Sequence, residues 1–181
     1  MSADAIETLL TATDLDDLMT AVEALPPDTD TARIGGVVDA WTDSQGLANV
    51  LMYPFVIPSS HRVPAVLRGL RSRGYLRLAA SVGVGHLPPA DLTDDVRREL
   101  LDALLDVVAS DAGPAGVRAS AELGPLLRAD EVELLEDLAA HPVDAVRHNL
   151  AQAALGVTAP AERQPVLLPY LPDYAEFLNA G

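Results

Sequence analysis

The sequence predicts an all-α fold, and three observations support this prediction. Aromatic residues make up only 4% of the 181 residues, while alanine, leucine and valine are abundant, a balance that suits closely packed helices better than a β-sheet. Apolar residues recur at helical spacing along most of the chain. Short segments rich in proline or glycine separate these stretches, so we expect a series of short helices.

Three helices are expected in the first 43 residues. "ADAIETLLTAT" carries an apolar face, and "TDLDDLMTAVEALPP" begins with Asp14, a candidate N-cap, and stops at Pro26. The third is expected over residues 31–41, although two consecutive glycines weaken its helical propensity.

The next segment, "QGLANVLMYPFVIP", fits either a helix that ends before Pro54 or a short apolar strand. We favour the helix followed by a loop, because prolines interrupt the remainder. The following stretch, "VPAVLRGLRSRGYLRLAASVGVGHLPP", divides at Gly74 and predicts two helices over about 63–72 and 75–86.

The clearest helical pattern is "TDDVRRELLDALLDVVASD", which has Thr93 as its expected N-cap and a continuous apolar stripe. Further helices are predicted after it, near residues 114–127, 130–140, 143–156 and 161–168.

Two of these segments share a pattern. "VASDAGPAGVRASAELG" (108–124) and "LAAHPVDAVRHNLAQAALG" (138–156) both contain a helix end, a turn with proline, Val-Arg, and then small and apolar residues; the two Val-Arg pairs are 29 residues apart. A helical hairpin of this length cannot close a core alone, so repeated hairpins must stack.

These residues resemble HEAT-like repeats and their leucine-rich-variant relatives, in which a "hydrophobic-Ala-x-x-Pro-x-x-x-Val-Arg" unit recurs. The resemblance runs through 93–157 and extends over 61–90. It implies a short right-handed α-solenoid of about five to six HEAT-like helical hairpins, whose concave face binds proteins or peptides. A few such relatives act on alkylated DNA bases or bilins. The expected organisation is a single domain over 1–181, with acidic helices in 1–43, a basic hairpin in 44–90, the clearest repeats in 91–170 and a tail in 171–181.

The charge distribution limits the classes of partner. The net charge is −15, but it is divided into −9 over residues 1–43, +5 over 44–90 and −11 over 91–181. A negative field of this size repels nucleic acids and anionic membranes, so we expect neither as a partner. With acids at the N-terminus, no long apolar run and no cysteine, the sequence predicts a soluble cytoplasmic protein without disulfides or thiolate chemistry.

The basic segment supplies the main candidate binding residues. They are Arg68, Arg71, Arg73, Arg77 and His86, with His61 and Arg62 nearby. Several guanidinium groups in one hairpin could clamp an anionic small molecule through bidentate hydrogen bonds. The alternative is a solvated helix face that neutralises the acidic ends of the same chain.

The repeated Val-Arg units add three further candidates for partner binding, Arg118, Arg147 and His148. The alternative for the arginines is a ladder of hydrogen bonds between repeats, and Asp144 is placed to form an i,i+3 pair with Arg147. The four histidines lack the spacing of a metal site, so we expect no metal and no cofactor.

The function that fits these observations is a noncatalytic interaction or scaffold module for a protein partner. One alternative is a small cofactor-independent enzyme, or ligand-binding protein, that uses an arginine-rich pocket for an anionic substrate. Another is an acidic inhibitor or immunity protein that masks a basic partner.

Overall fold

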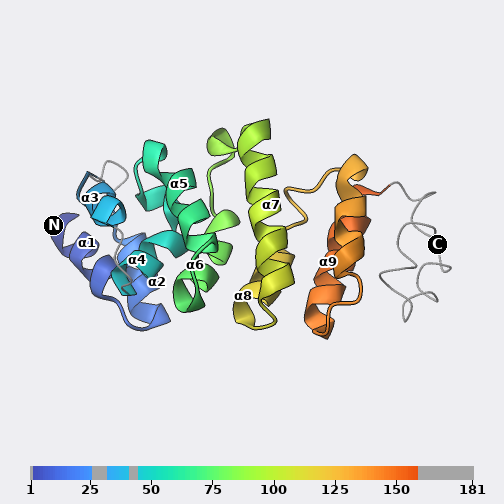
Figure 1. Ribbon diagram of the computed structural model, residues 1–181. Helices are drawn as coiled ribbons and strands as arrows, with labels where there is room; N and C mark the ends of the chain where they lie inside the picture. The colour runs from blue at the N-terminus through green and yellow to red at the C-terminus, as the bar shows by residue number, and fades with distance from the viewer. Residues whose placement is uncertain (1, 26–31, 41–44, 159–181) are drawn as a thin grey trace. The chain divides into compact units, whose positions relative to one another are not determined.

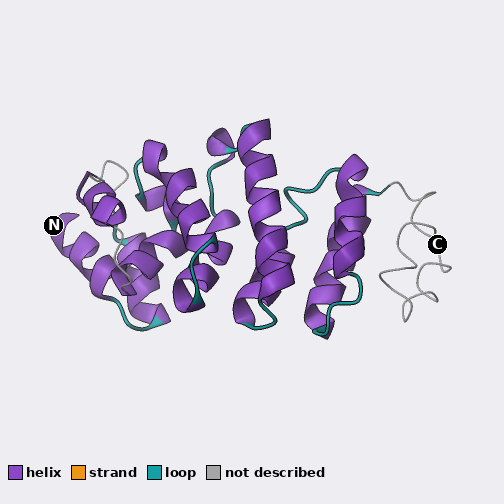
Figure 2. Cartoon of the chain, in the orientation of Figure 1, coloured by secondary structure: helices purple, strands orange, loops and turns teal. Residues whose placement is uncertain are grey.

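The regular structure of the chain is helical. The computed structural model describes residues 2–25, 32–40 and 45–158, and among these residues none lies in a β-strand (Figure 2). The prediction of an all-α fold is therefore confirmed. The chain divides into two compact units, Met1–Val96 and Arg97–Gly181.

The first unit is built from pairs of short helices (Figure 1). Its elements are α1 (Ser2–Thr11), α2 (Leu15–Glu23), α3 (Ala32–Ala40), α4 (Gln45–Met52), η1 (Pro54–Val56), α5 (Ser59–Leu70), α6 (Gly74–Val84) and η2 (Pro89–Asp91). Helix α1 packs against α2, and α5 packs against α6. Helix α4 contacts α1, α3, α5 and α6, and it therefore lies at the centre of the unit.

Two close contacts hold α4 in this central position. The buried side chain of Asn49 donates hydrogen bonds to the carbonyls of Leu9 (2.7 Å) and Ala12 (3.0 Å), which lack helical partners at the end of α1. On the other side, a Cβ atom at Gly83 would lie 1.9 Å from the carbonyl oxygen of Leu51. Only glycine lets α6 approach the α4 backbone this closely.

The predicted helix cap and helix end of this unit agree with the structure, but one helix begins earlier than predicted. Asp14 caps α2, because its Oδ1 accepts from the backbone N–H of Asp17 (2.9 Å). Helix α4 ends before Pro54, as expected. Helix α5, however, begins at Ser59 rather than near residue 63, since the carbonyl of Pro58 already accepts from the N–H of His61 (2.8 Å). Proline at position 64 therefore lies inside the helix.

The second unit contains the greater part of α7 (Asp94–Ser110), followed by α8 (Pro114–Ala121), η3 (Ala129–Leu138) and α9 (Asp144–Val157). The predicted cap at Thr93 is present, since its Oγ1 accepts from the N–H of Val96 (3.3 Å). Helix α8 ends earlier than the predicted residue 127. Pro125 disfavours helical geometry at the residue before it, Gly124. The helix expected over 161–168 and the tail lie outside the described residues.

The segment predicted as an α-helix over 130–140 is instead a 3-10 helix, η3. Its buried apolar residues, Val132, Leu135 and Leu138, are spaced every three residues, and three residues per turn is the period of this helix. Leu134, which falls between them, is 42% exposed. The buried apolar residues therefore follow the period of the helix that the segment forms.

Candidate functional site

A cluster of exposed side chains around a half-buried tyrosine lies where α2, η1 and the end of α6 meet. Its centre is Tyr53, and it also contains Met19, Phe55 and His86; we call these four residues the Tyr53 patch. The Tyr53 ring meets the Phe55 ring edge to face (centroids 5.9 Å apart) and stacks on the His86 ring (5.4 Å, 10° between planes). Its hydroxyl donates to the Met19 sulfur (3.0 Å). Phe55 is 42% exposed and Met19 39% exposed.

The backbone beneath the Tyr53 patch is fixed by hydrogen bonds. The Nδ1 atom of His86 donates to the Met52 carbonyl (2.8 Å), which orients the imidazole that stacks on Tyr53. Arg62 donates through Nε to the carbonyls of Pro54 (3.2 Å) and Ile57 (2.7 Å), and through Nη2 to that of Phe55 (3.2 Å).

The remaining fork of Arg62 also has a partner, because Nη1 pairs with Asp91 Oδ2 at 3.2 Å. Arg62 was a candidate for binding an anion, but its guanidinium group is used to hold η1 in place. Its neighbour His61 pairs with Asp39 (2.9 Å).

The other arginines of the basic segment lie at the opposite end of the α5–α6 hairpin from His86. Arg71 and Arg73 are exposed in the turn between the helices, and Arg77 lies in the first turn of α6, whereas His86 follows the last turn of that helix. Arg68 donates to the Val38 carbonyl (3.0 Å). The hairpin therefore separates the predicted arginine group from the predicted histidine.

The candidates of the Val-Arg units lie on α8 and α9. Arg118 of α8 pairs with Glu122, the residue that follows the end of this helix. Arg147 pairs with Asp144, which confirms the expected i,i+3 contact, and it also donates to the His141 carbonyl. Both arginines thus form contacts close in sequence. His148 is exposed on α9.

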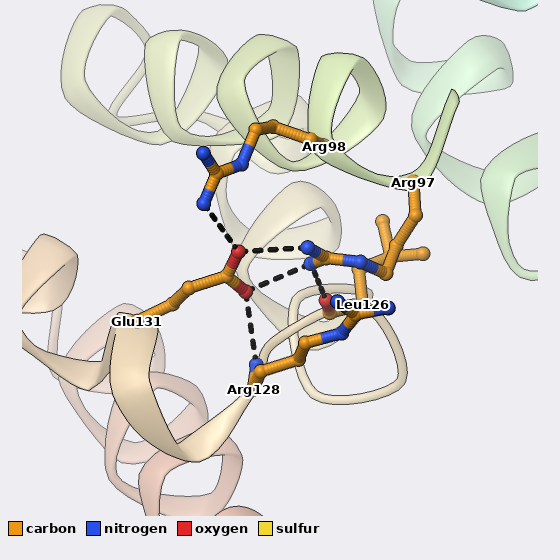
Figure 3. A network of polar contacts seen from close by, with 5 residues as sticks. All are labelled: Arg97, Arg98, Leu126, Arg128 and Glu131. Atoms are coloured by element: carbon orange, nitrogen blue, oxygen red, sulfur yellow. Dashed lines mark hydrogen bonds and ion pairs between the residues drawn. The ribbon is translucent and has the colours of Figure 1, made fainter. Parts of the chain in front are cut away.

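In the second unit, two arginine side chains and a backbone N–H hold the buried carboxylate of Glu131; we call this arrangement the Glu131 clamp (Figure 3). Arg97 binds both oxygens of Glu131 (2.7 and 2.8 Å), and Arg98 donates to Oε1 (3.0 Å). The backbone N–H of Arg128 donates to Oε2 (3.1 Å), and Arg97 also reaches the Leu126 carbonyl. Glu131 is only 4% exposed.

These contacts define what Glu131 can do chemically. The hydrogen bonds from Arg97, aided by Arg98 and the Arg128 backbone, outweigh the effect of burial and lower the pKa of Glu131 from 4.5 to about 2. A carboxylate with such a low pKa accepts protons poorly near neutral pH, so Glu131 is unsuited to general-base catalysis. The clamp joins α7 to η3 and is a structural feature.

Sequence reasoning did not identify the Tyr53 patch or the Glu131 clamp. Arg97 and Glu131 are 34 residues apart, and no local pattern connects them. One local signal existed, because a glutamate three residues after Arg128 is placed to cap a helix start. The patch had no such signal, since Met19, Phe55 and His86 come from three separate segments.

Within the described residues, no three histidine, aspartate or glutamate side chains are grouped so that they could hold a metal ion. Across the same residues, every helix is too short or too polar to cross a membrane. Comparison of the chain with protein-family models, curated protein sequences and solved structures finds no match.

Proposed function

We propose that this chain is a noncatalytic protein-binding module that holds its partner at the Tyr53 patch. The observation that carries the proposal is the exposure of Phe55 (42%) and Met19 (39%) around a tyrosine whose ring and hydroxyl are both engaged. Tyrosine, phenylalanine and methionine are enriched in protein interfaces. Large apolar side chains gathered at the surface mark sites of association more often than scattered ones.

The rigid support of the patch also favours binding. Arg62 holds the η1 backbone through three carbonyls, and the Met52 carbonyl holds His86. Side chains that are already ordered lose less conformational entropy when a partner binds. The patch therefore has the composition and the preorganisation of an interaction site.

We further propose that the helices form a short right-handed α-solenoid of HEAT-like hairpins. Two neighbouring pairs in the first unit support this arrangement, because α3 contacts α5 while α4 contacts α6. In the second unit, Asn149 of α9 donates to the Val117 carbonyl (3.2 Å) and to the Ser120 hydroxyl (3.0 Å) of α8. This contact joins the two helices that carry the repeated Val-Arg units.

The proposed function is tested with two matched variants of the full chain, Phe55→Ser and Leu134→Ser. Both replace an apolar side chain that is 42% exposed, but Leu134 lies on η3, outside the patch. Each purified protein is immobilised, proteins retained from the source-cell extract are quantified by mass spectrometry, and the retained partner is then purified and titrated.

We expect the dissociation constant of the partner to rise at least tenfold for Phe55→Ser and to stay within twofold for Leu134→Ser. Loss of an aromatic anchor from an interface commonly has an effect of this size. If the partner binds Phe55→Ser as tightly as the unsubstituted chain, or if both variants weaken it equally, the patch is not the binding site. Circular dichroism melting curves establish that both variants are folded.

A further inference from the structure

We infer that the turn between α5 and α6 is a second binding surface, which takes short carboxylate-rich peptide segments. Residues 44–90 contain five arginines and no acid, in a chain whose net charge is −15. Four of these arginines fall between residues 68 and 77. The segment that contains the turn is therefore cationic, in an otherwise acidic chain.

The conformation of the turn is fixed by its own hydrogen bonds. Gly74 has a φ of 60°, which glycine adopts without strain, and it lets α6 begin directly after α5 ends. The Ser72 hydroxyl donates to the Gly69 carbonyl (2.6 Å), and Nε of Arg77 donates to the Ser72 carbonyl (2.8 Å). The side chains at the tip therefore project from a defined backbone.

Four arginines of this segment lie at or near the turn. Arg68 and Arg77 hydrogen-bond to backbone carbonyls of Val38 and Ser72 and so stabilise the surrounding structure. Arg71 and Arg73 are exposed at the tip, two residues apart, and Tyr75 beside them is 48% exposed. We call Arg71, Arg73 and Tyr75 the basic turn.

The chemistry of the basic turn matches carboxylates. A guanidinium group presents a planar fork of N–H donors that matches the two oxygens of a carboxylate, and a neighbouring tyrosine ring adds apolar contact area. Residues 91–181 carry seventeen acids against six arginines. A long polyanion such as nucleic acid would be repelled by this charge, whereas a peptide with a few carboxylates engages the turn alone.

The test uses a fluorescently labelled hexaglutamate peptide, titrated with the full chain in 50 mM NaCl and followed by fluorescence anisotropy. The matched variants are Arg73→Gln and Arg98→Gln. Each removes one positive charge, but Arg98 is 64% exposed on α7, outside the turn, and both contacts of Arg97 with Glu131 remain when Arg98 is replaced. A double variant, Arg71→Lys with Arg73→Lys, keeps the charge and removes the guanidinium forks.

We expect saturable binding that weakens at least tenfold for Arg73→Gln, at least threefold for the double lysine variant, and less than twofold for Arg98→Gln. Absence of saturable binding to the unsubstituted chain, or equal weakening by Arg98→Gln and Arg73→Gln, overturns the inference. Tighter binding of an eight-nucleotide oligothymidylate than of the peptide overturns the assignment to carboxylates. Phe55→Ser should leave peptide binding unchanged, so this test and that of the Tyr53 patch fail independently.

Discussion

At the scale of single residues, Glu131 connects two helices of the second unit through one carboxylate. It accepts hydrogen bonds from Arg97, Arg98 and the Arg128 backbone while it is almost fully buried. A buried ion pair adds little net stability compared with an apolar pair, but removal of one partner leaves the other charge uncompensated. The clamp should therefore be sensitive to substitution.

We predict that Glu131→Gln lowers the free energy of unfolding by about 3 kcal/mol at pH 7, because the variant loses the buried ion pair with Arg97. Urea denaturation measures the change. Glu133→Gln is the control, since Glu133 is exposed on the same helix and surface substitutions stay within about 0.5 kcal/mol. Equal effects of the two substitutions would contradict a role of the clamp in stability.

The contribution of Glu131 to the free energy of unfolding should also depend on pH. The pKa of Glu131 is lowered from 4.5 to about 2 in the folded protein, so its contribution to stability is complete above pH 4.5 and is lost as the pH falls towards 2. The difference in free energy of unfolding between the unsubstituted protein and Glu131→Gln should shrink over this interval. A difference that stays constant from pH 7 to pH 2.5 would show that the carboxylate charge is not responsible.

At the scale of elements, the contact of α4 with α6 depends on a glycine. We predict that Gly83→Ala lowers the free energy of unfolding by about 2 kcal/mol, because its methyl group would meet the Leu51 carbonyl at 1.9 Å and force the helices apart. Gly36→Ala, in exposed surroundings on α3, meets nothing within 4 Å and should raise stability by about 0.5 kcal/mol. Thermal melts of both variants measure these opposite changes, and destabilisation by Gly36→Ala would contradict the packing described.

In the 3-10 helix η3, two adjacent leucines differ in burial. Leu135 is fully buried and Leu134 is 42% exposed. We predict that Leu135→Ala lowers the free energy of unfolding by about 3 kcal/mol, while Leu134→Ala changes it by less than about 0.5 kcal/mol. Chemical denaturation distinguishes the two, and a large loss for Leu134→Ala would mean that the segment has a different register.

Sequence patterns predicted the elements whose signals are local. The caps at Asp14 and Thr93 lie within three residues of the N–H groups that they bind, so their function could be derived from the sequence. The winding of η3 was missed, because its apolar spacing of three also fits an α-helix over this length. The Tyr53 patch could not be predicted, since the exposure of Phe55 depends on how α2, η1 and α6 come together.

For the whole molecule, the repulsion between its like charges is the property that salt changes most directly. At −15, self-repulsion opposes compact structure, and added salt screens it. We predict that raising NaCl from 10 to 150 mM increases the melting temperature by about 2 °C or more. A variant with Asp130, Glu133 and Glu136 neutralised should respond less, and a melting temperature that falls with salt would contradict the prediction.

Helix α5 has a consequence for how a partner could be recognised. It is twelve residues long, or about 18 Å, with the Tyr53 patch near its start and the basic turn after its end. If one partner engages both proposed surfaces, its second contact forms at a high effective concentration once the first is made. The length of α5 would then favour partners whose aromatic-binding and acidic groups are spaced to match.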